Sequence, residues 1–150
     1  MKCDITNLEE AGRALDRFND FHDGFIKTLA LVSGDEMKPN GMQVCTGAFR
    51  VLIDFAHENY GPSGQPDGRI VHAEFEDVRG FHLDLRDVGQ ADWTILVLDV
   101  AQAKSSRLLL KMAYAHFDGQ SWQEQKVDLF TFTTATFEER QANQEIHGTR

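Results

Sequence analysis

The sequence predicts a mainly β fold, either an antiparallel β-sandwich or a partly open barrel, with one N-terminal α-helix. Apolar residues recur at helical spacing in only one segment, near the start of the chain. Further along, apolar and polar residues alternate in one segment after another, with turns rich in Gly, Pro and Asp between them. Because the chain has 150 residues and eleven Phe, it can form one domain, 1–150, with its own hydrophobic core.

The helix is expected over residues 6–19. Thr6-Asn7-Leu8-Glu9 matches a capping box, in which the Thr6 hydroxyl accepts a hydrogen bond from the backbone N–H of Glu9. The apolar residues that follow at helical spacing are Leu8, Ala11, Leu15 and Phe18. Gly24 then interrupts the helical pattern, so we expect a strand to begin there.

About seven mainly antiparallel strands are expected over residues 24–137. They cover 24–32, 49–55, 71–75, 81–85, 93–100, 107–117 and 127–137. Asp118-Gly119 predicts a hairpin turn between two of them. Turn-forming residues dominate 59–68, which predicts a loop, and the polar tail 138–150 is expected to be a frayed helix or disordered.

The charge balance limits the classes of partner. The chain carries 24 acidic and 15 basic residues, a formal net charge of −9, with the acidic residues spread over both halves. Such a surface repels phosphate groups, so we expect neither a nucleic acid nor an anionic membrane as a partner. A basic protein partner is compatible with this charge.

Compartment and cysteine use point to the cytoplasm. The start of the chain has no apolar stretch of the kind found in secretory signals, and no apolar run is long enough to span a membrane. Cys3 and Cys45 are too few for a disulfide framework. We therefore expect a cytoplasmic protein.

The adjacent His22 and Asp23 are the first candidate for a chemical site. Such a pair can bind a metal when helices supply further histidines, but here it lies between one helix and a strand. We expect the carboxylates of Asp20 and Asp23 to accept hydrogen bonds from backbone N–H groups at this junction. His22 is expected to pack between helix and sheet.

A second candidate is a metal site on the face of the sheet. Residues two apart on a strand face the same way, so His72 shares a face with Glu74, and His82 shares one with Asp84. If the two strands pair through residues 77–80, all four side chains converge. Imidazole and carboxylate groups together suit zinc or another divalent ion. The alternative is that these are ordinary polar residues on a half-exposed sheet.

The loop 61–68 is expected to be the place where a partner binds, with Tyr60, Gln65 and Asp67 in contact with it. It lacks the lysine and the helix start that a phosphate-binding loop requires.

Nucleophilic catalysis has little support in the sequence. None of the serines lies in a G-x-S-x-G motif. Cys45 is expected to be a half-buried structural thiol, since no basic residue beside it in the sequence would activate it. Trp93 and Trp122 are expected in the core.

Three short motifs resemble those of a known group of proteins. A short helix runs into Phe21-His22-Asp23-Gly24, an F-x-x-V-x-x-F-x-L unit covers 75–83, and a later strand begins with Trp93. Over residues 10–100 this resembles small bacterial β-rich domains that include some polymorphic-toxin immunity proteins. The resemblance implies a protein that neutralises a toxin by binding it, with no catalysis of its own.

We therefore expect a non-enzymatic, immunity-like binding protein without a cofactor, which presents an acidic surface and the loop 61–68 to a protein partner. One alternative is a metal-assisted hydrolase that uses the four sheet residues and a divalent ion such as zinc. Another is a small-ligand carrier with a cavity between its β-layers. Open edge strands would also allow a homodimer.

Overall fold

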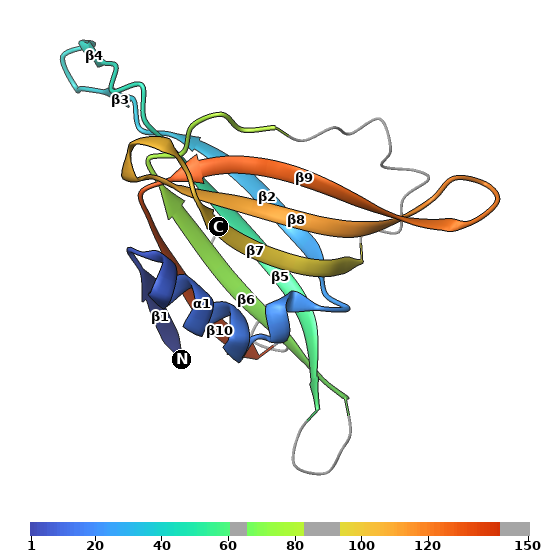
Figure 1. Ribbon diagram of the computed structural model, residues 1–150. Coiled ribbons are helices and arrows are strands. Elements are labelled where there is room, and N and C mark those ends of the chain that lie inside the picture. The colour runs from blue at the N-terminus through green and yellow to red at the C-terminus, as the bar shows by residue number, and fades with distance from the viewer. Residues whose placement is uncertain (61–65, 83–93, 142–150) are drawn as a thin grey trace.

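Two antiparallel sheets form the two layers of a sandwich in the computed structural model, which describes residues 1–60, 66–82 and 94–141 (Figure 1). The larger sheet consists, in spatial order, of β1 (Lys2–Ile5), β10 (Thr134–Gln141), β6 (Pro66–Glu76), β5 (Phe49–Tyr60) and β2 (Phe25–Ser33). The smaller sheet consists of β7 (Ile95–Gln102), β8 (Leu108–Phe117) and β9 (Trp122–Phe132). Neither sheet closes into a barrel, so the predicted sandwich is confirmed.

The helix α1 (Leu8–Arg17) widens the second layer, because it lies beside β7 and faces the larger sheet (Figure 1). Its buried residues are Ala11, Ala14 and Leu15, which join the common core. A 3-10 turn, η1 (Asn19–Phe21), follows the helix, and a second one, η3 (Lys104–Ser106), precedes β8.

The capping box lies one residue later than predicted. Asn7, not Thr6, is the N-cap, and its side chain accepts a hydrogen bond of 3.0 Å from the backbone N–H of Glu10. The Glu10 carboxylate in turn accepts from the N–H and the hydroxyl of Thr6, at 2.8 and 2.7 Å. Because Thr6 is tied in this way, the residues before it extend as β1, a strand that the sequence did not predict.

The core lies between the two sheets and follows from the two-residue period of the strands. On β5 and β6, residues 51, 53 and 55 pair with 75, 73 and 71, and all six side chains are buried. The Phe75 ring lies 5.0 Å from the ring centres of both Phe130 and Phe132 on β9. Aromatic side chains from opposite layers therefore fill the space between the sheets at this point.

Residues 81–85 do not pair with β6 as expected. Both sides of β6 are already occupied, by β5 and by β10. Instead, Arg79 pairs with Thr131, and the N–H of His82 donates to the carbonyl of Leu129 at 2.7 Å. Residues 79–82 thus lie along β9 in the smaller sheet, and the rest of the predicted strand lies outside the described residues.

The predicted strand 127–137 is in fact two strands. β9 ends at Phe132 in the smaller sheet, and β10 begins at Thr134 in the larger one. The chain changes layer here because residues on both sides of the change are buried, among them Phe132 and Phe137. A single uninterrupted strand would place only one of these segments in a sheet.

Three hairpins project from the sandwich (Figure 1). The shortest, β3 (Glu36–Met37) and β4 (Gln43–Val44), forms at the turn residues predicted near 33–41. The predicted Asp118-Gly119 turn connects β8 and β9. β5 and β6 extend further into 59–68 than expected, so only 61–65 lie between them, outside the described residues.

Candidate functional site

The His22-Asp23 pair lies exposed at the helix-to-strand junction. The His22 Nδ1 atom is 3.0 Å from the Asp23 carboxylate, and more than half of each side chain is exposed. The expectation that His22 packs between helix and sheet is wrong, since Phe21 is the residue buried there. Backbone carbonyl groups, not the carboxylates of Asp20 and Asp23, accept from the N–H groups of residues 22–24.

Gly24 is required at this junction by close packing of the backbone. A Cβ atom at this position would lie 2.8 Å from the carbonyl oxygen of Ala56 and 2.9 Å from that of Phe21. The carbonyl of Gly24 also accepts a hydrogen bond of 2.7 Å from the N–H of Ile95, which joins the two layers. The motif is therefore structural in this fold.

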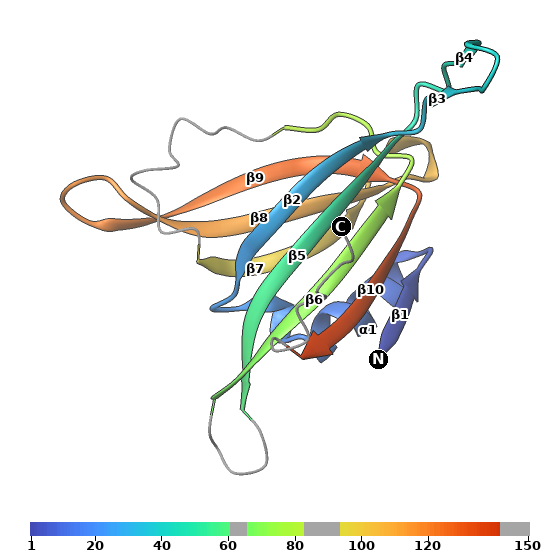
Figure 2. The same ribbon diagram turned by 180° about the vertical axis from the view of Figure 1, so that it is seen from behind.

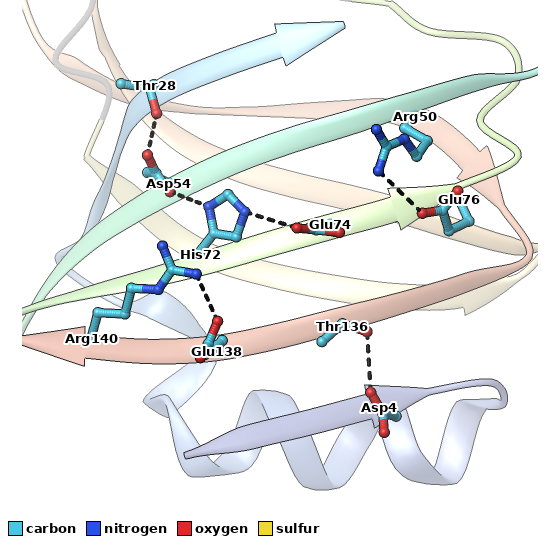
Figure 3. A network of polar contacts seen from close by, with 10 residues as sticks. All are labelled: Asp4, Thr28, Arg50, Asp54, His72, Glu74, Glu76, Thr136, Glu138 and Arg140. Carbon is cyan, nitrogen blue, oxygen red and sulfur yellow. Dashed lines mark hydrogen bonds and ion pairs between the residues drawn. The ribbon is translucent and has the colours of Figure 1, made fainter. Parts of the chain in front are cut away.

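A polar network covers part of the outer face of the larger sheet, which the second layer leaves open (Figures 2 and 3). His72 is at its centre: Nδ1 lies 2.7 Å from Asp54 on β5, and Nε2 lies 3.2 Å from Glu74 on β6. The Thr28 hydroxyl donates to the other oxygen of Asp54 at 2.6 Å. Three adjacent strands thus contribute to one chain of hydrogen bonds.

The electrostatics of this network favour an ionised Asp54. Burial acts first, raising the pKa of Asp54, but hydrogen bonds from Thr28 and His72 act in the opposite direction. With the positive charge of Arg140 added, the net result is a pKa below the usual value. When both ring nitrogens of His72 carry a proton, the imidazole donates to both carboxylates.

This geometry differs from that of a metal site. A metal ligand must direct a ring nitrogen lone pair at the ion, but each nitrogen of His72 faces a carboxylate, and the two carboxylates lie on opposite sides of the ring. Among the described residues, no group of three or more His, Cys, Asp or Glu is arranged to hold a metal.

The structure brings together only part of the predicted metal site. His72 and Glu74 are in contact. His82 lies beside β9 in the other sheet, so the shared face expected from strand pairing does not form. Asp84 lies outside the described residues.

The predicted partner-binding residues lie at the end of the β5–β6 hairpin. Tyr60 pairs with Pro66, and Asp67 pairs with Asn59. The side chains of Tyr60 and Asp67, and all of Gln65, lie outside the part of the chain that the structure describes. Their role in binding stays a prediction.

An aromatic pair at the end of the β8–β9 hairpin was not predicted as a site. Trp122 is 60% exposed and Phe117 is 39% exposed, so the expected place of Trp122 in the core is wrong. The two residues face each other across the hairpin, with ring centres 5.3 Å apart. The hairpin carries them beyond the larger sheet (Figure 1), which is why they have no core to enter. Trp93 lies outside the described residues.

The turn that joins these strands is held by one carboxylate. Asp118 accepts hydrogen bonds from the backbone N–H groups of Gln120 and Ser121, at 2.8 and 2.9 Å. Its other oxygen accepts from the side-chain amide of Gln123 at 2.9 Å. Gly119 has a φ of 97°, which a residue with a Cβ rarely adopts. These contacts fix the aromatic tip relative to the strands.

A shallow depression of about 200 Å³ lies on the outer face of the smaller sheet, on the same strands as the aromatic pair. Its apolar lining comes from Val97, Met112, Ala113 and Val127. Its charged lining comes from Asp99, Lys111, Glu124 and Lys126. This combination of an apolar floor and a charged rim is typical of protein interfaces.

The two cysteines are free thiols. Cys45 is exposed, which corrects the expectation that it is half-buried. Cys3 is partly buried, and its sulfur lies 3.5 Å from a guanidinium nitrogen of Arg17.

Comparison with known proteins adds no relative to this description. No protein-family model, no curated protein and no solved structure matches the chain. Within residues 1–60, 66–82 and 94–141, no helix has the length and apolar character needed to cross a membrane.

Proposed function

We propose that this protein is a non-catalytic protein-binding domain whose anchor is the aromatic tip of the β8–β9 hairpin, formed by Phe117 and Trp122. The observation that carries the proposal is the exposure of Trp122, a large apolar side chain 60% open to solvent at the end of a projecting hairpin. Trp is among the residues that contribute most to protein interfaces when a partner buries it.

The fixed geometry of the tip supports this role. Because Asp118 already holds the turn in one conformation, a partner does not have to order it. Ordering of loops and side chains opposes association, so a rigid aromatic anchor loses less free energy on binding than a flexible one. The depression beside Val97 gives the partner a second apolar contact on the same strands.

The expected partner is a basic protein. A net charge of −9 attracts a positively charged surface over distances comparable to the Debye length, about 10 Å at 0.1 M salt. A toxin, as the resemblance to immunity proteins implies, is one such partner, and this identity stays a prediction. We also propose a cytoplasmic location, because both cysteines are free thiols, as is usual in a reducing compartment.

The test is affinity capture from a lysate of the source organism, with the full chain as bait, followed by titration of the purified partner. We expect Trp122→Ala to weaken binding by about 30-fold or more, the loss typical of a central aromatic anchor. Met37→Ala is the matched control, because Met37 is 69% exposed on a different hairpin. Thermal unfolding should be the same for all three proteins.

Salt provides a second measurement. At about 0.5 M salt, where screening acts over only a few ångströms, the affinity for a basic partner should fall. Equal binding by Trp122→Ala and the unmodified chain would overturn the assignment of the anchor. Turnover of a substrate by the pure protein would overturn the non-catalytic role.

A further inference from the structure

The four edge strands of the two large sheets differ in how they are protected. Edge strands expose backbone N–H and C=O groups, which can pair with another chain unless something prevents it. β1 has only four residues, two of them charged, Lys2 and Asp4. β7 has α1 beside it, and its Ile95 exchanges backbone hydrogen bonds with residues 23–24. β9 has residues 79–82 along its outer side.

The fourth edge, β2, lacks such protection in the described part of the chain. It has nine residues and pairs only with β5 (Figure 2). Its segment 28–33 contains no charge, no Pro and no Gly. Leu31, on this segment, is 51% exposed although its register partner Val51 is fully buried. A long, uncharged, β-prone edge of this kind is suited to pairing with another strand.

The charges at the two ends of β2 indicate which strand that is. Lys27 lies near the start of β2, whereas Asp35 and Glu36 follow directly after its end, and all three are exposed. If two copies of β2 pair antiparallel, Lys27 of each copy lies near the acidic end of the other. Parallel pairing would instead place like charges together, which is unfavourable.

We infer that β2 pairs antiparallel with β2 of a second copy of this chain, giving a homodimer with two-fold symmetry. The two five-stranded sheets then continue as one sheet of ten strands. Leu31 becomes buried at the contact, and the Lys27 ends meet the acidic ends. Identical patches related by a two-fold axis form a closed dimer and not an open filament. This inference is independent of the binding function proposed for the β8–β9 hairpin.

The first experiment measures molar mass by light scattering at about 100 μM protein, where an interface of micromolar affinity is saturated. We expect twice the chain mass of 17.0 kDa. Leu31→Lys should raise the dimer dissociation constant by about 100-fold, because the buried charge enters the interface twice. Val97→Lys is the matched control, a strand residue 43% exposed on the other sheet, and should leave the mass unchanged.

Charge exchange tests the antiparallel orientation without changing the apolar residues. Lys27→Glu and Glu36→Lys should each shift the chain toward monomer, and the double variant should restore the dimer. A monomeric unmodified chain at this concentration would overturn the inference. So would a dimer that Leu31→Lys leaves intact, or a double variant no more dimeric than the single ones.

Discussion

The two faces of the larger sheet are built from the same strands but have different chemistry. On β5 and β6, the inner face holds buried apolar residues such as Ile53 and Phe75, whereas the outer face holds Asp54, His72 and Glu74. Adjacent residues thus lie on opposite sides of the sheet, one in a close-packed core and the other in a hydrogen-bonded, partly solvated network.

Two histidines show the same difference. His57 is on the inner face, 8% exposed, with its ring edge against Phe18 and Phe21. His72 is on the outer face, between two carboxylates. The position of each residue in the two-residue period of its strand, and not its chemical type, decides its surroundings. We therefore expect substitutions on the two faces to differ strongly in their effect on stability.

The largest effect is expected for the inner face. Phe75→Ala should lower the free energy of unfolding by about 3–5 kcal/mol, because it removes a buried ring that packs against Phe130 and Phe132 and leaves a cavity. Glu74→Ala, the neighbouring residue on the outer face, is the control and should cost less than about 1 kcal/mol. Urea unfolding of both variants measures the difference. Equal losses would contradict the assignment of the two faces.

A smaller effect is expected at the centre of the outer network. Asp54→Ala removes the acceptor of hydrogen bonds from Thr28 and His72, so it should cost about 1–2 kcal/mol. Thr28→Val removes only the hydroxyl and should cost less, about 0.5–1 kcal/mol. Chemical unfolding followed by circular dichroism gives both values. If Thr28→Val cost as much as Asp54→Ala, the contact between Asp54 and His72 would contribute nothing.

The pH dependence of stability sharpens the same point. Since the pKa of Asp54 is lower in the folded state, its contribution is present above the pKa of the unfolded chain, about 4. The contribution is lost as the pH falls through the lower folded value. Asp54→Asn should therefore be less stable than the unmodified chain at about pH 6, and the gap should narrow toward about pH 2.5. A gap that stayed constant with pH would show that ionisation of Asp54 has no part in stability.

The smallest effect is expected for the exposed ion pair on the same face. The nearest charged atoms of Arg50 and Glu76 lie 3.9 Å apart, and 46% of each side chain is exposed. Glu76→Gln should change the free energy of unfolding by less than about 0.5 kcal/mol. Thermal unfolding at low and high salt would detect any larger contribution, which would show that the outer face is less solvated than its exposure indicates.

The alternation of residue types was sufficient to predict most strands of the larger sheet. Segments 24–32, 49–55 and 71–75 correspond to β2, β5 and β6, because one face of each is apolar and the other polar. The strand favoured for 107–117 is also confirmed, as β8. The short β1 was not predicted, since four residues with a single fully buried side chain, Ile5, give no recognisable period.

The polar site was predicted only within a single strand. His72 and Glu74 share a face because they are two residues apart, and this follows from strand geometry alone. Asp54 was missing from the predicted site because it lies 18 residues earlier in the sequence and meets His72 only through the register of β5 with β6. His82 was included because the sequence does not show which strands are neighbours.

The sequence by itself determined the mainly β class, the single helix, the turn at Asp118-Gly119 and the acidic surface, since these depend on periods and charges that act locally or sum over the chain. Only the tertiary structure decided which strands pair, that the chain changes sheet after Phe132, and that Trp122 lies outside the core. Strand order depends on contacts between residues far apart in the chain, and the exposure of a side chain depends on whether a second layer covers it. Neither is encoded in the spacing of neighbouring residues.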